Sequence, residues 1–136
     1  MAASPADAPF GGLILTEEAR PGPASHDGAG RRFVFCPPAA DAGHLYALDV
    51  ELRALPAPAH LGRALGPQAM RHWGRIEVMA KLLNIPAHLM LRRHLAGEAA
   101  ALIRAHGLTF CRADTATHWR IVGRRPSDGA RRYTVA

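Results

Sequence analysis

The spacing of apolar residues changes near residue 55, from a repeat of two to a repeat close to 3.6. Residues 44–52 alternate between an apolar row and a charged row, a pattern that continues to Arg53. The apolar row is Tyr46, Leu48, Val50 and Leu52, and the charged row is Asp49, Glu51 and Arg53. After Pro56 and Pro58 the apolar residues recur at helical spacing. Because side chains alternate across a strand and recur every three to four residues on a helix, the pattern predicts a half-buried strand followed by helices.

Two shorter strands are predicted before this point. Residues 12–16 and 32–36 are apolar and rich in β-branched or aromatic side chains, and Pro37 ends the second of them. The segments 1–10 and 20–31 are rich in Ala, Pro, Gly, Ser and Asp, which predicts irregular structure.

The helical region divides at local signals. A helix is expected from about Gln68 to Asn84, because Asn tolerates the left-handed conformation that ends many helices and Pro86 disfavours a helical residue before it. A second helical stretch is expected over residues 86–106, with a possible division at Gly97.

The remainder of the chain reads as β-structure. Residues 108–111 can begin a strand, and residues 117–122 and 131–135 look like the arms of a hairpin whose turn is 126–129. Strands, then helices, then a hairpin predict a single α+β domain over residues 1–136. We expect an antiparallel sheet with two or three helices on one face and a C-terminal β-hairpin.

Charge is distributed unevenly between the two parts of the chain. Residues 1–60 hold 4 basic and 7 acidic side chains, a net charge of −3, whereas residues 61–136 hold 13 and 4, a net charge of +9. The basic helical-hairpin region at 68–136 therefore favours a polyanionic or acidic partner, although high Arg usage in an Ala-, Gly- and Pro-rich chain also fits a solvated basic face.

Residues 78–95 resemble a helix-turn-helix. The motif needs a small residue in the first helix, a turn residue that tolerates positive φ, an apolar residue after the turn and an apolar position in the second helix. The residues that meet these needs in order are Ala80, Asn84, Ile85 and Met90. Together with the predicted hairpin, the segment is similar to winged-helix DNA-binding domains.

This resemblance implies that residues 86–95 are a recognition helix and that the hairpin tip is a basic wing. Its expected nucleic-acid-binding residues are His88, Arg92, Arg93, Arg124, Arg125, Arg131 and Arg132. The function it implies is that of a nucleic-acid-binding protein such as a transcriptional or plasmid/phage-type regulator, with DNA and RNA both open.

Two other classes of function stay open. In the first, the chain is a small subunit or adaptor whose arginines bind an acidic protein partner. In the second, it is a small enzyme with an anionic substrate that uses Glu77 or His118. The groupings that motivate an enzyme are Glu77 with His72, Arg71 and Arg75, and Asp114 with His118. Neither spacing is diagnostic, so no catalytic residue is assigned.

Several classes of site lack a signal in the sequence. The eight histidines show no HExxH or HxH spacing, and no glycine-rich phosphate loop is present, so no metal and no cofactor are predicted. Cys36 and Cys111 lie far apart, and no export signal or membrane-spanning segment is visible, which favours a cytoplasmic protein that does not enter a membrane. The oligomeric state is not predicted.

Overall fold

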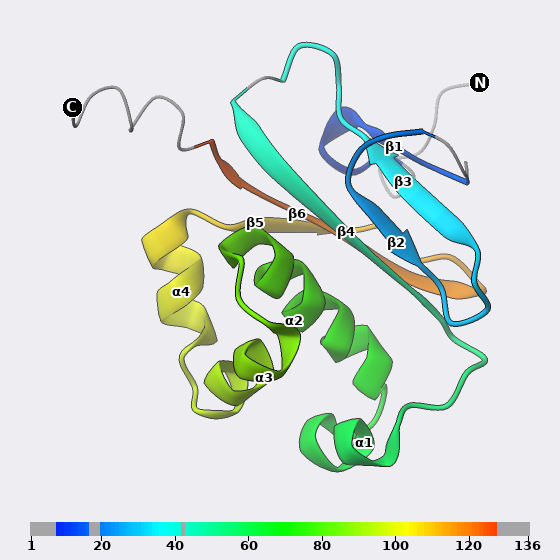
Figure 1. Ribbon diagram of the computed structural model, residues 1–136, viewed down its shortest axis with the longest axis vertical. Helices are drawn as coiled ribbons and strands as arrows, with labels where there is room; N and C mark the ends of the chain where they lie inside the picture. The colour runs from blue at the N-terminus through cyan, green and yellow to red at the C-terminus, as the bar shows by residue number, and fades with distance from the viewer. Residues whose placement is uncertain (1–7, 17–19, 42, 128–136) are drawn as a thin grey trace.

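The computed structural model, which describes residues 8–16, 20–41 and 43–127, has three layers. A main antiparallel sheet lies in the middle, helices cover one of its faces, and a smaller antiparallel sheet packs against the other (Figure 1). The α+β class, the helices on one face of an antiparallel sheet and the C-terminal hairpin are therefore confirmed.

The main sheet has the order β4-β6-β5. Strand β4 (His44–Leu52) has the bounds that the alternating pattern predicts. Strand β6 (His118–Pro126) pairs with β4 over its whole length, and strand β5 (Thr109–Arg112) pairs with the other side of β6. The C-terminal hairpin thus consists of β5 and β6, and β6 is the central strand of the main sheet. The segment 131–135, which we expected to be an arm of the hairpin, lies outside the described residues.

The charged row of β4 is not the solvent-exposed row that the alternation predicts. Helix α2 (Ala69–Leu83) crosses this face, and Asp49 is only 4% exposed. Gly74 explains the close approach, because a Cβ atom at this position would lie 3.1 Å from Asp49 Oδ2. The prediction of a half-buried strand is wrong because a helix covers one face and the small sheet covers the other.

The small sheet has the order β1-β3-β2. Its strands are β1 (Leu13–Leu15), β2 (Ala24–His26) and β3 (Arg32–Cys36), all antiparallel. The core between the two sheets contains Phe33, Phe35, Leu48, Val50 and Val122. Strand β2 lies within the segment 20–31, so the expectation that this whole segment is irregular is wrong. Residues Pro9–Gly11 form a short 3₁₀ helix, η1.

Four helices form the third layer of the described chain. They are α1 (Ala59–Leu65), α2, α3 (Ala87–Leu95) and α4 (Ala99–His106). Asn84 ends α2 with φ of 54°, in the left-handed conformation that the sequence predicts. The predicted division at Gly97 is also present, because this residue has φ of 79° between α3 and α4. Helix α1 was not expected. None of the described helices has the length and apolar character needed to span a membrane.

Candidate functional site

The residues expected from the helix-turn-helix resemblance are only partly brought together. His88, Arg92 and Arg93 are exposed on α3, and Arg93 Nη1 lies 3.9 Å from Glu98 Oε1. Met90 is fully buried and packs α3 against the core on the helix side of the main sheet.

The two described wing residues lie on opposite faces of β6, because consecutive side chains of a strand point to opposite sides. The guanidinium carbon of Arg124 lies 4.3 Å from the centre of the Phe10 ring, and its Nη1 is 3.7 Å from Asp41 Oδ2. Arg125 Nη1 donates a hydrogen bond to the carbonyl oxygen of Leu82 at 3.0 Å. These two arginines therefore do not meet at one tip. Arg131 and Arg132 lie outside the described residues.

A different set of arginines converges on the helix-covered face of the main sheet. We call this set, with its two aromatic rings, the arginine–aromatic surface; its members are Arg53, Arg71, Arg75, Arg112, Phe110 and Trp119. The guanidinium carbon of Arg53 lies 3.7 Å from the centre of the Trp119 ring, and that of Arg71 lies 5.6 Å from it. The Arg75 guanidinium lies 5.2 Å from the centre of the Phe110 ring. Each of these distances is within cation–π range.

The fold explains this convergence. The backbone N–H of Arg53 donates to the Thr117 carbonyl oxygen at 2.9 Å, which extends the β4–β6 ladder and sets Arg53 close to Trp119. Arg71 and Arg75 are four residues apart on α2 and so share one side of the helix. Arg112 lies on β5, where its guanidinium reaches back to α2 and donates to the Arg71 carbonyl oxygen.

Asp114 contacts two of the four guanidinium groups of this surface. It accepts a hydrogen bond from Arg112 Nη1 at 3.1 Å and lies 3.8 Å from Arg71 Nε. Burial lowers the pKa of Arg112, the charges of Arg71 and Arg75 lower it further, and Asp114 opposes the shift. Such crowding of like charges indicates a surface that would be stabilised by an external anion.

Basic side chains of α3 lie next to the arginine–aromatic surface. Burial lowers the pKa of His94, and the nearby charges of Arg75 and His72 lower it further. His94 therefore lies close to Arg75 of the arginine–aromatic surface. Its neighbour Arg93 is exposed. His72, on α2, is exposed.

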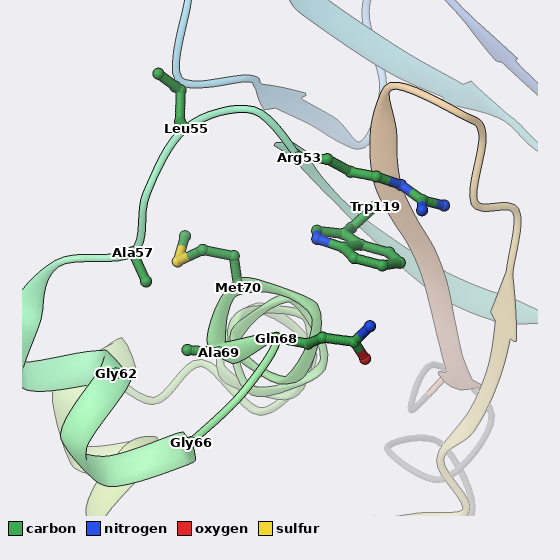
Figure 2. Close-up of a pocket in the computed structure, with 9 residues that line it drawn as sticks. All are labelled: Arg53, Leu55, Ala57, Gly62, Gly66, Gln68, Ala69, Met70 and Trp119. Atoms are coloured by element: carbon green, nitrogen blue, oxygen red, sulfur yellow. The ribbon is translucent and has the colours of Figure 1, made fainter.

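A cavity of about 310 Å³ adjoins Trp119 at the N-terminal end of α2. Figure 2 shows Arg53, Trp119 and the amide of Gln68 extending toward one side of it, while Met70 and Ala57 line the other. The remaining lining residues are Leu55, Gly62, Gly66 and Ala69. The cavity combines an aromatic ring, an amide that can donate and accept, and an apolar floor, which is the composition of small-molecule and base-binding pockets.

The two groupings that suggested an enzyme do not form. Asp114 binds the arginines described above, whereas His118 Nε2 lies 2.9 Å from Asp27 Oδ2. Glu77 interacts electrostatically with Asp49 and Glu51. Among the described residues no three His, Cys, Asp or Glu side chains are placed to hold a metal ion.

The carboxyl groups of Asp49 and Glu51 interact with each other under α2. Burial raises the pKa of Asp49 to about 6 and, together with the charge of Asp49, raises that of Glu51 to about 9. Lys81 lies close enough to oppose both shifts, and its Nζ donates to the Leu48 carbonyl oxygen at 2.7 Å.

The variant Glu51→Gln should be less sensitive to alkaline pH than the wild type. Because the native state holds protons that the unfolded chain releases above the ordinary carboxyl pKa of 4.5, the stability of the wild type falls as pH rises toward 9. The glutamine has no proton to lose, so we expect its stability to exceed that of the wild type at pH 8 and to approach it at pH 5. Urea unfolding at both pH values measures this difference. Equal pH dependence of the two proteins would contradict the raised pKa of Glu51.

No protein-family model matches the chain, and no curated protein and no solved structure shows significant similarity to it.

Proposed function

We propose that the protein binds nucleic acid, with single strands preferred, through the arginine–aromatic surface. The observation that carries this proposal is that four guanidinium groups, from the residue after β4, from α2 and from β5, lie on one face, where Asp114 contacts two of them. Guanidinium groups fork onto phosphate oxygens, and their stacking on aromatic rings orients them without neutralising them.

The preference for single strands rests on the cavity beside Trp119. Proteins that bind single strands combine a positive groove with aromatic rings and planar guanidinium groups on which bases stack. The stacked Arg53–Trp119 pair, with the Gln68 amide nearby, offers these features at the edge of the positive surface. A base in a duplex is paired and stacked, and so is not free to enter such a cavity.

A duplex-binding mode through α3 is the second candidate. It is favoured by the left-handed turn at Asn84, by the buried Met90 and by the exposed basic side chains of His88, Arg92 and Arg93. The winged-helix resemblance stays a prediction.

A cytoplasmic location fits both modes and fits the two free cysteines, Cys36 and Cys111.

Binding of a labelled mixed-sequence 20-nucleotide single strand, measured by fluorescence anisotropy against salt, tests the proposal. Each neutralised phosphate of a single strand contributes about −0.7 to the slope of log K against log salt, so four arginines predict a slope of about −3. The matching duplex, used as competitor, should displace the single strand weakly. Strong competition by the duplex would favour the α3 mode. No binding at 50 mM salt would rule out a nucleic-acid partner and leave an acidic protein partner as the explanation of the surface.

A further inference from the structure

A second cavity lies on the other face of β6, next to a chain of hydrogen bonds that links three side chains. His118 Nε2 is 2.9 Å from Asp27 Oδ2, and His118 Nδ1 is 2.8 Å from Thr117 Oγ1. All three residues line the cavity, whose volume is about 430 Å³, and the other lining residues are Ala29, Arg31 and Leu52.

Asp27 is held rigidly as a carboxylate. It lies in the turn between β2 and β3, where Oδ1 accepts hydrogen bonds from the backbone N–H groups of Ala29 and Arg31, each at 3.0 Å. Its side chain is 3% exposed, and burial opposes its ionisation. The hydrogen bonds from His118, Arg31 and Ala29 outweigh burial and lower the pKa of Asp27, so the group is ionised at neutral pH.

The ionised Asp27 fixes the tautomer of His118. A carboxylate only accepts hydrogen bonds, so Nε2 must carry the proton and donate it. In the neutral imidazole Nδ1 is then the acceptor, and the Thr117 hydroxyl donates to it. Phe33 packs against the imidazole with ring centres 5.2 Å apart, which holds the ring in this orientation.

The exposed Thr117 hydroxyl is thus a potential nucleophile with a base at hydrogen-bond distance and a carboxylate behind that base. The hydroxyl is also positioned by its own loop. Thr115 Oγ1 accepts a hydrogen bond from the His118 backbone N–H at 3.1 Å and lies 3.4 Å from Thr117 Oγ1.

We infer that Thr117, His118 and Asp27 form an acyl-transfer site for small esters, with Thr117 as nucleophile and His118 as general base. Thr117 Oγ1 attacks the carbonyl carbon of the ester, and its proton moves to His118 Nδ1. The tetrahedral intermediate then loses its alkoxide, which takes that proton. Water attacks the acyl-threonine by the same route, releases the carboxylic acid and restores the Thr117 hydroxyl.

The cavity indicates the class of substrate. Its lining is small and apolar at Ala29 and Leu52 and carries one positive charge at Arg31. An ester with a short acyl group fits this lining, and the guanidinium of Arg31 favours negative charge that develops on the carbonyl oxygen.

The site is separate from the proposed nucleic-acid surface. His118 and Trp119 are consecutive on β6, so their side chains lie on opposite faces of the main sheet. The two activities can therefore fail independently, and variants of Thr117 should bind oligonucleotides as the wild type does.

Reaction with 4-nitrophenyl acetate tests the inference. We expect a burst of 4-nitrophenolate, with an acetyl group on the peptide that contains Thr117 as located by mass spectrometry. The variant Thr117→Val keeps the shape of the side chain and the backbone bond to Arg53 but has no hydroxyl. It should lose the burst, with the acylation rate lowered by about 10²-fold or more.

Two further variants separate chemistry from loss of structure. Thr117→Ser retains a hydroxyl and should retain the burst, whereas Asp27→Asn should lower the rate at least tenfold because the tautomer of His118 is no longer fixed. Circular dichroism and thermal unfolding of each variant show that it folds. An undiminished burst in folded Thr117→Val, or acetylation of other side chains only, would overturn the inference.

Discussion

Replacing Arg75 by glutamate weakens the binding of a mixed-sequence single strand by about 10- to 100-fold at 150 mM salt. The substitution changes the charge of the arginine–aromatic surface by two units, close to Phe110 and His94. A hydrogen bond to a charged group is worth about 1.5–3 kcal/mol, and each 1.4 kcal/mol corresponds to a factor of ten. Arg75 is exposed, so its loss should cost little stability beyond the contact with Phe110. Fluorescence anisotropy measures the change in affinity.

Arg20→Glu is the matched control for this variant. Arg20 is exposed and precedes β2, in the layer on the far side of the main sheet from the helices. The substitution makes the same change in net charge, so at 150 mM salt, where charges beyond about 8 Å are screened, it should leave binding nearly unchanged. If both variants weaken binding equally, attraction depends on the net charge of the chain, and the arginine–aromatic surface has no special part in it.

Replacing Gly123 by alanine destabilises the fold by about 1–3 kcal/mol, because helix α2 packs directly on this glycine. An added Cβ atom would lie 2.4 Å from Val78 Cγ1, 3.0 Å from Leu82 Cδ1 and 3.2 Å from the Phe110 ring. The first of these atoms belongs to a branched side chain that is fully buried, so it cannot move away without shifting the helix. Urea unfolding followed by circular dichroism gives the free energy of unfolding.

Gly62→Ala provides the control for the loss of a glycine. Gly62 lies inside helix α1, its φ is not positive, and a Cβ atom there meets no other atom within 4 Å. Alanine restricts the unfolded chain and favours the helix, so we expect a gain of about 0.4–1 kcal/mol. If Gly123→Ala were instead as stable as the wild type, helix α2 could not pack on Gly123 as closely as the structure shows.

The elements that the sequence predicts are those with a long periodic pattern or a strong local signal. Strand β4 follows from its alternation, and helix α2 from its apolar stripe and the left-handed Asn84 at its end. Helix α1 and strand β2 are short, so neither repeats a pattern long enough to detect. The burial of Asp49 depends on α2 crossing β4 at Gly74, which is a tertiary contact that alternation within one strand does not encode.

The candidate site was less accessible from the sequence than the fold. The excess of positive charge in the second part of the chain was visible, but the arginines that converge were not those expected. Arg53 meets Trp119 only because β4 pairs with β6 in one register, and the two residues are 66 positions apart. Arg124 and Arg125 look like a basic cluster in the sequence, yet a strand directs them to opposite faces. Likewise, the partner of His118 is Asp27, which lies 91 residues away in the chain.

The central claim is that arginines from distant segments bind one nucleic-acid ligand as a single surface. The most direct measurement follows the side-chain Nε–Hε signals of the arginines by NMR during titration with the single-stranded 20-mer. We predict that the signals of Arg53, Arg71, Arg75 and Arg112 shift together and saturate at one concentration, while those of Arg20 and Arg32 stay in place. Shifts confined to arginines outside the arginine–aromatic surface, or no shifts at all at 50 mM salt, would contradict the claim.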